Sequence, residues 1–139
     1  MIKLKRAYEK HGRDDGHRIL VERLWPRGLT KRQAKIDLWL KDVAPSTELR
    51  RWFGHDPDKW NEFRQRYQKE LKQKDQLIKL LRRKAKAGTI TLIYAARDEE
   101  HNGALVLQRF LQKRLTGISK SKAAMAQSVE ASGSGSARN

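Results

Sequence analysis

Two arginines and a tryptophan follow a short apolar run near the start of the chain. Residues 19–21 are Ile, Leu and Val, a run that is typical of a buried strand. Arg23, Trp25 and Arg27 follow around a rigid Pro-Arg-Gly turn. Ligands of open α/β folds bind beyond the carboxyl ends of strands, and a guanidinium group is a planar fork that matches phosphate or carboxylate. The segment predicts an anion site with an indole wall. The alternative is structural, with one arginine paired to Asp37 and the indole packed.

A second polar group follows the strongest predicted strand, which ends at Tyr94. Two small alanines come next and would let a ligand approach the backbone. A helix predicted to start near Asp98 would add free N–H groups that can bind an anion. We therefore expect Tyr94 as a second wall, Arg97 as a charge, and His101 and Asn102 as polar ligand contacts, whereas Asp98 is expected to be a structural cap.

A third candidate lies where another helix begins after a proline. Ser46 is foremost an N-cap, the role that serine commonly has there. Its hydroxyl group, the free N–H groups of the first turn and Arg50 one turn later also form a possible phosphate cradle. Ser46 and Arg50 are therefore included among the predicted ligand-binding residues.

The strong positive charge favours an alternative function. The chain has 32 Lys and Arg against 16 Asp and Glu, a formal net charge of +16, and such a field attracts polyanions. Residues 57–87 are predicted as two amphipathic helices whose aromatic side chains face inward, so base stacking is not expected from them. Their outer face predicts a nucleic-acid-binding surface, or simply a solvated face, made of Arg66, Lys69, Lys72, Arg83 and Lys86.

The composition excludes several classes of chemistry. The chain has no cysteine, so disulfides, thiolate chemistry and cysteine-ligated metals are excluded. The histidine spacings fit no compact metal motif, so no metal site is predicted. Neither a cofactor-binding fingerprint nor a catalytic triad is recognisable, and no cofactor is expected. Without a membrane-spanning run or a signal-peptide core, we expect a cytoplasmic protein with no membrane partner.

The predicted elements alternate between strands and helices. This order indicates an α/β fold, a single compact domain with a small, mainly parallel sheet flanked by helices. Strands are predicted at residues 2–8, 17–22, 36–40 and 89–94. Helices are predicted to start at the caps Thr30, Ser46, Asp56, Asp75 and Asp98. The domain is expected to cover residues 1–116, followed by a disordered Ser/Gly/Ala-rich tail at 117–139.

Several of these segments together resemble a known family. The resemblance covers residues 16–115 and is carried by the motifs GHRILVERLWPRG (16–28), DLWL (37–40), APSTELR (44–50) and TLIYAARD (91–98). These are similar to the YeaO-like proteins, a family of domains of unknown function (DUF488). The resemblance implies a compact cytoplasmic α/β domain with no established activity.

The chain departs from this family's pattern at two positions. The family usually has Asp where this chain has Glu22, and His where this chain has Gly103. Glu22 in place of Asp keeps the negative charge and makes the side chain longer. If the histidine is catalytic in relatives, the resemblance implies an altered or lost activity here.

Overall fold

The computed structural model describes residues 1–124, with side chains as far as residue 113. The chain divides into two compact units, Met1–Arg109 and Phe110–Asn139. The first unit contains the sheet and every predicted site residue. No helix in the described residues is both long enough and apolar enough to cross a membrane.

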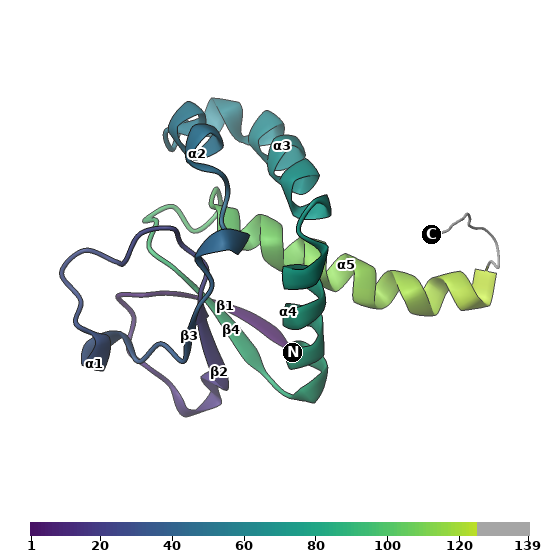
Figure 1. Ribbon diagram of the computed structural model, residues 1–139, viewed down its shortest axis with the longest axis horizontal. Helices are drawn as coiled ribbons and strands as arrows, with labels where there is room; N and C mark the ends of the chain where they lie inside the picture. Colours follow the sequence, from purple (N-terminus) through teal and green to yellow (C-terminus); the bar gives the residue numbers. More distant parts are fainter. Residues whose placement is uncertain (125–139) are drawn as a thin grey trace. The chain divides into compact units, whose positions relative to one another are not determined.

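The centre of the first unit is a parallel four-stranded sheet (Figure 1). The strands are β1 (Ile2–Arg6), β2 (His17–Leu20), β3 (Leu38–Trp39) and β4 (Ile90–Tyr94), in the spatial order β1-β4-β2-β3. Every strand pair is parallel, which confirms the predicted α/β class. Strand β4 lies between β1 and β2 and is buried along its whole length, as its β-branched and apolar sequence predicts.

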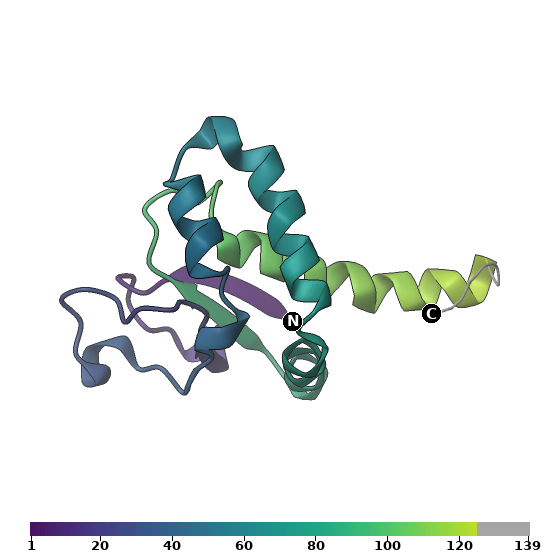
Figure 2. The same cartoon turned by 45° about the horizontal axis from the view of Figure 1, so that its top comes forward.

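The helices are α1 (Lys31–Ala34), α2 (Thr47–Phe53), α3 (Trp60–Lys72), α4 (Asp75–Ala87) and α5 (Gly103–Ala124). Helices α1 and α2 begin directly after the predicted caps Thr30 and Ser46. Asp56 caps a 3-10 turn (Pro57–Lys59) that leads into α3, and Asp75 is the first residue of α4 and not its cap. The hydroxyl of Thr30 accepts from the N–H of Gln33 and caps α1. Helices α2 and α3 lie side by side in both views (Figures 1 and 2). A break separates α3 from α4 at residues 73–74, where Lys74 donates to the C=O of Ala44 at 2.9 Å.

The last helix corrects one prediction. Helix α5 begins at Gly103, not near Asp98, and its first turn is capped by Asn102, whose Oδ1 accepts from the N–H of Leu105 at 2.9 Å. The Asp98 carboxylate instead accepts from the N–H of His101 at 3.0 Å, within a turn that precedes the helix. The helix is described as far as Ala124, past the predicted domain end at residue 116. Residues 125–139 of the predicted tail lie outside the described residues, so the tail stays a prediction.

A buried charge network lies beside β2. Arg18 is 1% exposed, and its Nη1 donates to the carboxylate of Asp15 at 2.5 Å. Lys5 donates to the same carboxylate at 3.0 Å. Burial raises the pKa of Asp15, but hydrogen bonds from the N–H of Gly12 and from the two cations outweigh it and hold the pKa at about 2. Arg18 also donates to the C=O of Ala34 at 2.8 Å, so the network ties β2 to α1.

Candidate functional site

The carboxyl ends of β1, β2 and β4 lie at one edge of the sheet. In the register of the strands Arg6 is opposite Tyr94, and Leu20 is opposite Ile93. The segments that leave this edge are residues 7–8, 21–28 and 95–97, which contain several of the predicted site residues. This is the edge at which parallel α/β sheets bind ligands.

A shallow hollow of about 400 Å³ opens at this edge. We call it the arginine hollow; its lining residues are Arg6, Tyr8, Arg27, Ala95 and Arg97. Three arginines from three separate segments therefore line it, and no acidic side chain is among the lining residues. The structure thus brings the predicted Arg27 and Arg97 together.

Contacts of Arg6 and Tyr8 organise the hollow. Arg6 Nε donates to the C=O of Ala96 at 2.8 Å, and its guanidinium lies over the Tyr8 ring, 5.3 Å from the centroid. The Tyr8 hydroxyl donates to the C=O of Arg27 at 2.9 Å. Arg27 and Arg97 are both exposed, and neither has a carboxylate partner within the described part of the chain. Their donors are free to bind a ligand.

A smaller cavity of about 60 Å³ is lined by Ala96, the residue that follows Ala95 of the hollow in the sequence. We call it the Glu22 pocket; its polar lining consists of Glu22, Arg50, His55, His101 and Asn102. Burial raises the pKa of Glu22, and the hydrogen bond from the N–H of Ala95 at 2.9 Å and the charges of Arg50 and His55 offset this only in part. The pocket combines a desolvated carboxyl with basic groups.

The two positions at which the resemblance implies a departure, 22 and 103, both lie in the Glu22 pocket. Glu22 and Gly103 line it together. A Cβ atom at position 103 would lie 3.2 Å from Cγ of Pro45, closer than an ordinary contact. A larger residue there requires Pro45 to move, so this chain's version of the pocket is built around glycine.

His101 and Asn102 are held differently within that pocket. His101 Nδ1 lies 2.8 Å from Asp98 Oδ2, and this hydrogen bond lowers the pKa of Asp98. The His101 ring packs edge-on against Trp60, and its Nε2 has no hydrogen-bond partner among the described residues. Asn102 is 5% exposed, donates to the C=O of Asp98 and caps α5. Its amide is committed to the fold, whereas His101 keeps one ring nitrogen available.

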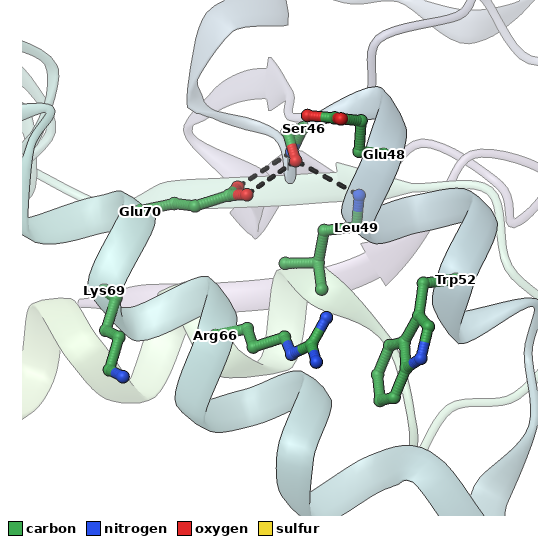
Figure 3. Close-up of a pocket in the computed structure, with 7 residues that line it drawn as sticks. All are labelled: Ser46, Glu48, Leu49, Trp52, Arg66, Lys69 and Glu70. Atoms are coloured by element: carbon green, nitrogen blue, oxygen red, sulfur yellow. Dashed lines mark hydrogen bonds between the residues drawn. The ribbon is translucent and has the colours of Figure 1, made fainter.

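Ser46 lies at a third site, a groove of about 500 Å³ between α2 and α3 (Figure 3). Its N–H and hydroxyl donate to the two oxygens of Glu70 at 2.8 and 2.5 Å, and its Oγ accepts from the N–H of Leu49. Glu48 also lines the groove. The predicted phosphate cradle at Ser46 is thus filled by a carboxylate of the chain itself, and Arg50 lines the Glu22 pocket instead.

Replacing Ser46 by Ala is expected to destabilise the protein by about 1 kcal/mol, because α2 loses its cap and Glu70 loses a donor. Urea denaturation followed by circular dichroism measures this. The matched control is Thr47→Ala, since Thr47 is exposed and its side chain does not cap the helix; it should change stability by less than about 0.5 kcal/mol. Equal losses in both variants would contradict the capping role.

Arg23, Trp25 and Tyr94 line none of these three hollows. Arg23 Nε donates to the C=O of Pro45 at 2.8 Å, and Arg23 Nη1 lies 3.8 Å from the exposed carboxylate of Asp42. The expected convergence of Arg23 with the other two arginines is therefore not observed. Tyr94 is 4% exposed and belongs to the core.

Trp25 follows the structural alternative. Its indole N–H donates to the C=O of Leu29 at 2.6 Å, and its ring packs edge-on against Trp39 with centroids 5.4 Å apart. Asp37, the carboxylate suggested as an arginine partner, accepts instead from the backbone N–H of Arg18 at 2.8 Å. The indole therefore packs in a small hydrophobic core and does not form a wall of a ligand site.

Arg6 and Tyr8 line the arginine hollow but were not among the residues predicted from the sequence. Arg6 ends β1, so the rule that placed Arg27 after β2 would have found it once β1 was known to pair with β4. The pairing of β1 with β4 spans most of the chain and carries no local signal. His55 was also missed as a pocket residue; it has a positive φ of 59°, uncommon outside glycine.

The residues predicted to bind nucleic acid lie on α3 and α4, and none of them lines the arginine hollow. Arg66, Lys69 and Lys72 are exposed on α3, and Arg83 and Lys86 are exposed on α4. Arg66 pairs with Glu62 and stacks over the Trp52 ring, 4.4 Å from the centroid.

The described residues contain no cluster of three or more acidic or histidine side chains able to hold a metal.

Comparisons with known proteins place the chain in a family. The uncharacterized protein YeaO of Escherichia coli is 43% identical over 111 residues, which cover 80% of this chain and 96% of YeaO. The uncharacterized protein Rv3073c of Mycobacterium tuberculosis is 40% identical over 113 residues, which cover 81% of this chain and 95% of that protein. No solved structure gives a significant match. A family model described as the inactive DUF488-N3 subclade (DUF488-N3i) matches residues 1–130. The chain therefore belongs to the YeaO-like DUF488 family, within its DUF488-N3i subclade.

Proposed function

We propose that this protein binds a small anion, a phosphate group or one of similar shape, in the arginine hollow. The observation that carries the proposal is the meeting of Arg6, Arg27 and Arg97 at the carboxyl edge of a parallel sheet, with no acidic side chain in the lining. Placing three positive charges close together costs electrostatic free energy unless a bound anion offsets the repulsion. The planar guanidinium group also matches the geometry of phosphate oxygens.

Two further features support binding over catalysis. Arg6 is held in place by its bond to the C=O of Ala96, so less conformational entropy is lost when an anion binds. The lining residues of the arginine hollow include no nucleophile or carboxylate for acid–base chemistry apart from the Tyr8 hydroxyl, which is engaged with a backbone carbonyl. The family's description as inactive points the same way.

The test is isothermal titration calorimetry with inorganic phosphate. Hydrogen bonds to charged groups contribute about 1.5–3 kcal/mol each, so Arg27→Met with Arg97→Met should weaken binding by about a hundredfold or more. The matched control replaces the exposed Arg32 and Arg51 by Met, which removes the same net charge elsewhere. The control should bind phosphate nearly as well as the wild type. Equal losses in the two double variants, or no phosphate binding by the wild type, would refute the site.

The exposed basic faces of α3 and α4 favour a second candidate, the binding of nucleic acid. It predicts that affinity for a single-stranded or duplex oligonucleotide falls steeply with salt. Replacing Lys69, Lys72, Arg83 and Lys86 by Gln should weaken that binding. The Arg27/Arg97 variant should leave it nearly unchanged. The absence of binding at low salt would remove this candidate.

A further inference from the structure

The arginine hollow and the Glu22 pocket share one stretch of backbone. Ala95 lines the hollow and Ala96 lines the pocket. The N–H of Ala95 donates to Glu22 Oε2 at 2.9 Å, and the C=O of Ala96 accepts from Arg6 Nε at 2.8 Å. A guanidinium of the hollow and the carboxyl of the pocket are therefore anchored to adjacent residues. Both cavities are thus lined by the segment that directly follows β4.

The polar groups of the Glu22 pocket include both donors and an acceptor. Glu22 uses Oε2 to accept from Ala95, and its Oε1 has no partner among the residues that the structure describes. Arg50 contributes a guanidinium group from α2, and His101 contributes the ring nitrogen that Asp98 does not bind. An entering group thus meets a free carboxyl oxygen on Glu22 and donors on Arg50. It also meets His101 Nε2, which accepts in the neutral ring because Nδ1 donates to Asp98.

These charges select a neutral polar group. An ammonium group would be repelled by Arg50, and a second anion would be repelled by Glu22 in a desolvated setting. A hydroxyl group both donates and accepts, so it can satisfy both kinds of partner at once. Pro45, Phe53 and Phe63 also line the pocket and suit the C–H faces of a sugar.

We infer that the two cavities form one bipartite site for a phosphorylated sugar or polyol. The phosphate binds in the arginine hollow, and a hydroxyl-bearing end enters the Glu22 pocket, where Glu22 accepts its hydrogen bond. This inference rests on the proposed function, since it takes the phosphate site as its first half. It adds the chemical class of the ligand.

The experiment compares three probes by calorimetry on the full chain: inorganic phosphate, pentyl phosphate and ribose 5-phosphate. Pentyl phosphate has a five-carbon chain without hydroxyl groups, so it separates hydroxyl recognition from size. We expect ribose 5-phosphate to bind the wild type at least about tenfold more tightly than either other probe. Glu22→Gln should remove this preference and leave the affinity for inorganic phosphate within about twofold.

A second variant, Arg50→Met, tests the site even if Glu22→Gln does not fold. Arg50 is exposed on α2, so Arg50→Met should fold normally and also reduce the preference for ribose 5-phosphate. Its control is Arg51→Met, because the neighbouring Arg51 is exposed and does not line the pocket. Inorganic phosphate binding without a preference for ribose 5-phosphate, or a preference kept in both Glu22→Gln and Arg50→Met, overturns the bipartite site alone. Failure of all three probes to bind the wild type overturns the proposed function itself.

Discussion

Replacing Arg18 by Met is expected to lower the free energy of unfolding by about 3–5 kcal/mol, the range observed when one partner of a buried ion pair is removed. The methionine fills much of the volume but donates no hydrogen bond. Asp15 would remain 4% exposed with Lys5 as its only cation, and the C=O groups of Ala34 and Lys35 would each lose a donor. Urea denaturation followed by tryptophan fluorescence measures the loss.

The matched control for Arg18 is Arg13→Met. Arg13 lies in the same 3-10 turn as Asp15 but is exposed, so its replacement should change stability by less than about 0.5 kcal/mol. A loss below about 1 kcal/mol in Arg18→Met would show that the buried network contributes little. It would also weaken the view that this network fixes the start of β2.

Replacing Gly16 by Ala should destabilise the fold by about 3 kcal/mol. Gly16 has φ of +64° just before β2, and a Cβ atom there would lie 2.1 Å from the carbonyl oxygen of Thr89. That oxygen accepts from the N–H of His17 at 3.0 Å, so it cannot move without disturbing the junction of β2 with β4. Thermal and urea unfolding both report this loss.

Gly28→Ala provides the control for Gly16. Gly28 also has a positive φ, +82°, but a Cβ atom there would meet nothing within 4 Å. Only the conformational cost of about 1 kcal/mol should remain. If the two variants lose equal stability, the close approach of Gly16 to Thr89 is not what requires glycine.

These two predictions explain what most of the family motif at residues 16–28 does. Gly16 and Arg18 hold the start of β2, Arg23 binds the carbonyl of Pro45, and Trp25 packs on Trp39. The most recognisable stretch of the sequence is therefore largely structural. Within this stretch, Val21 and Glu22 line the Glu22 pocket and Arg27 lines the arginine hollow.

Local signals predicted the elements well where one residue type decides the geometry. Thr30 and Ser46 cap their helices through their hydroxyl groups, as serine and threonine do at that position. The error at α5 arose because Asp98 and Asn102 are both good caps. Asp98 closes a turn within its own neighbourhood, and the helix starts only after Asn102.

The site could be predicted only in part, because its geometry depends on which strands are neighbours. Arg27 and Arg97 each follow a strand, so both were placed at the carboxyl edge correctly. Arg6 required the pairing of β1 with β4, residues about ninety positions apart, which no local pattern reveals. Arg23 was misplaced because sequence cannot tell an arginine facing a ligand from one facing backbone carbonyls, such as that of Pro45.

The most direct test of the anion site is a crystal structure of the protein grown with tungstate, an anomalous scatterer that has the shape of phosphate. We expect an anomalous peak between the guanidinium groups of Arg6, Arg27 and Arg97. Peaks only at other basic groups, with this hollow empty, would contradict it.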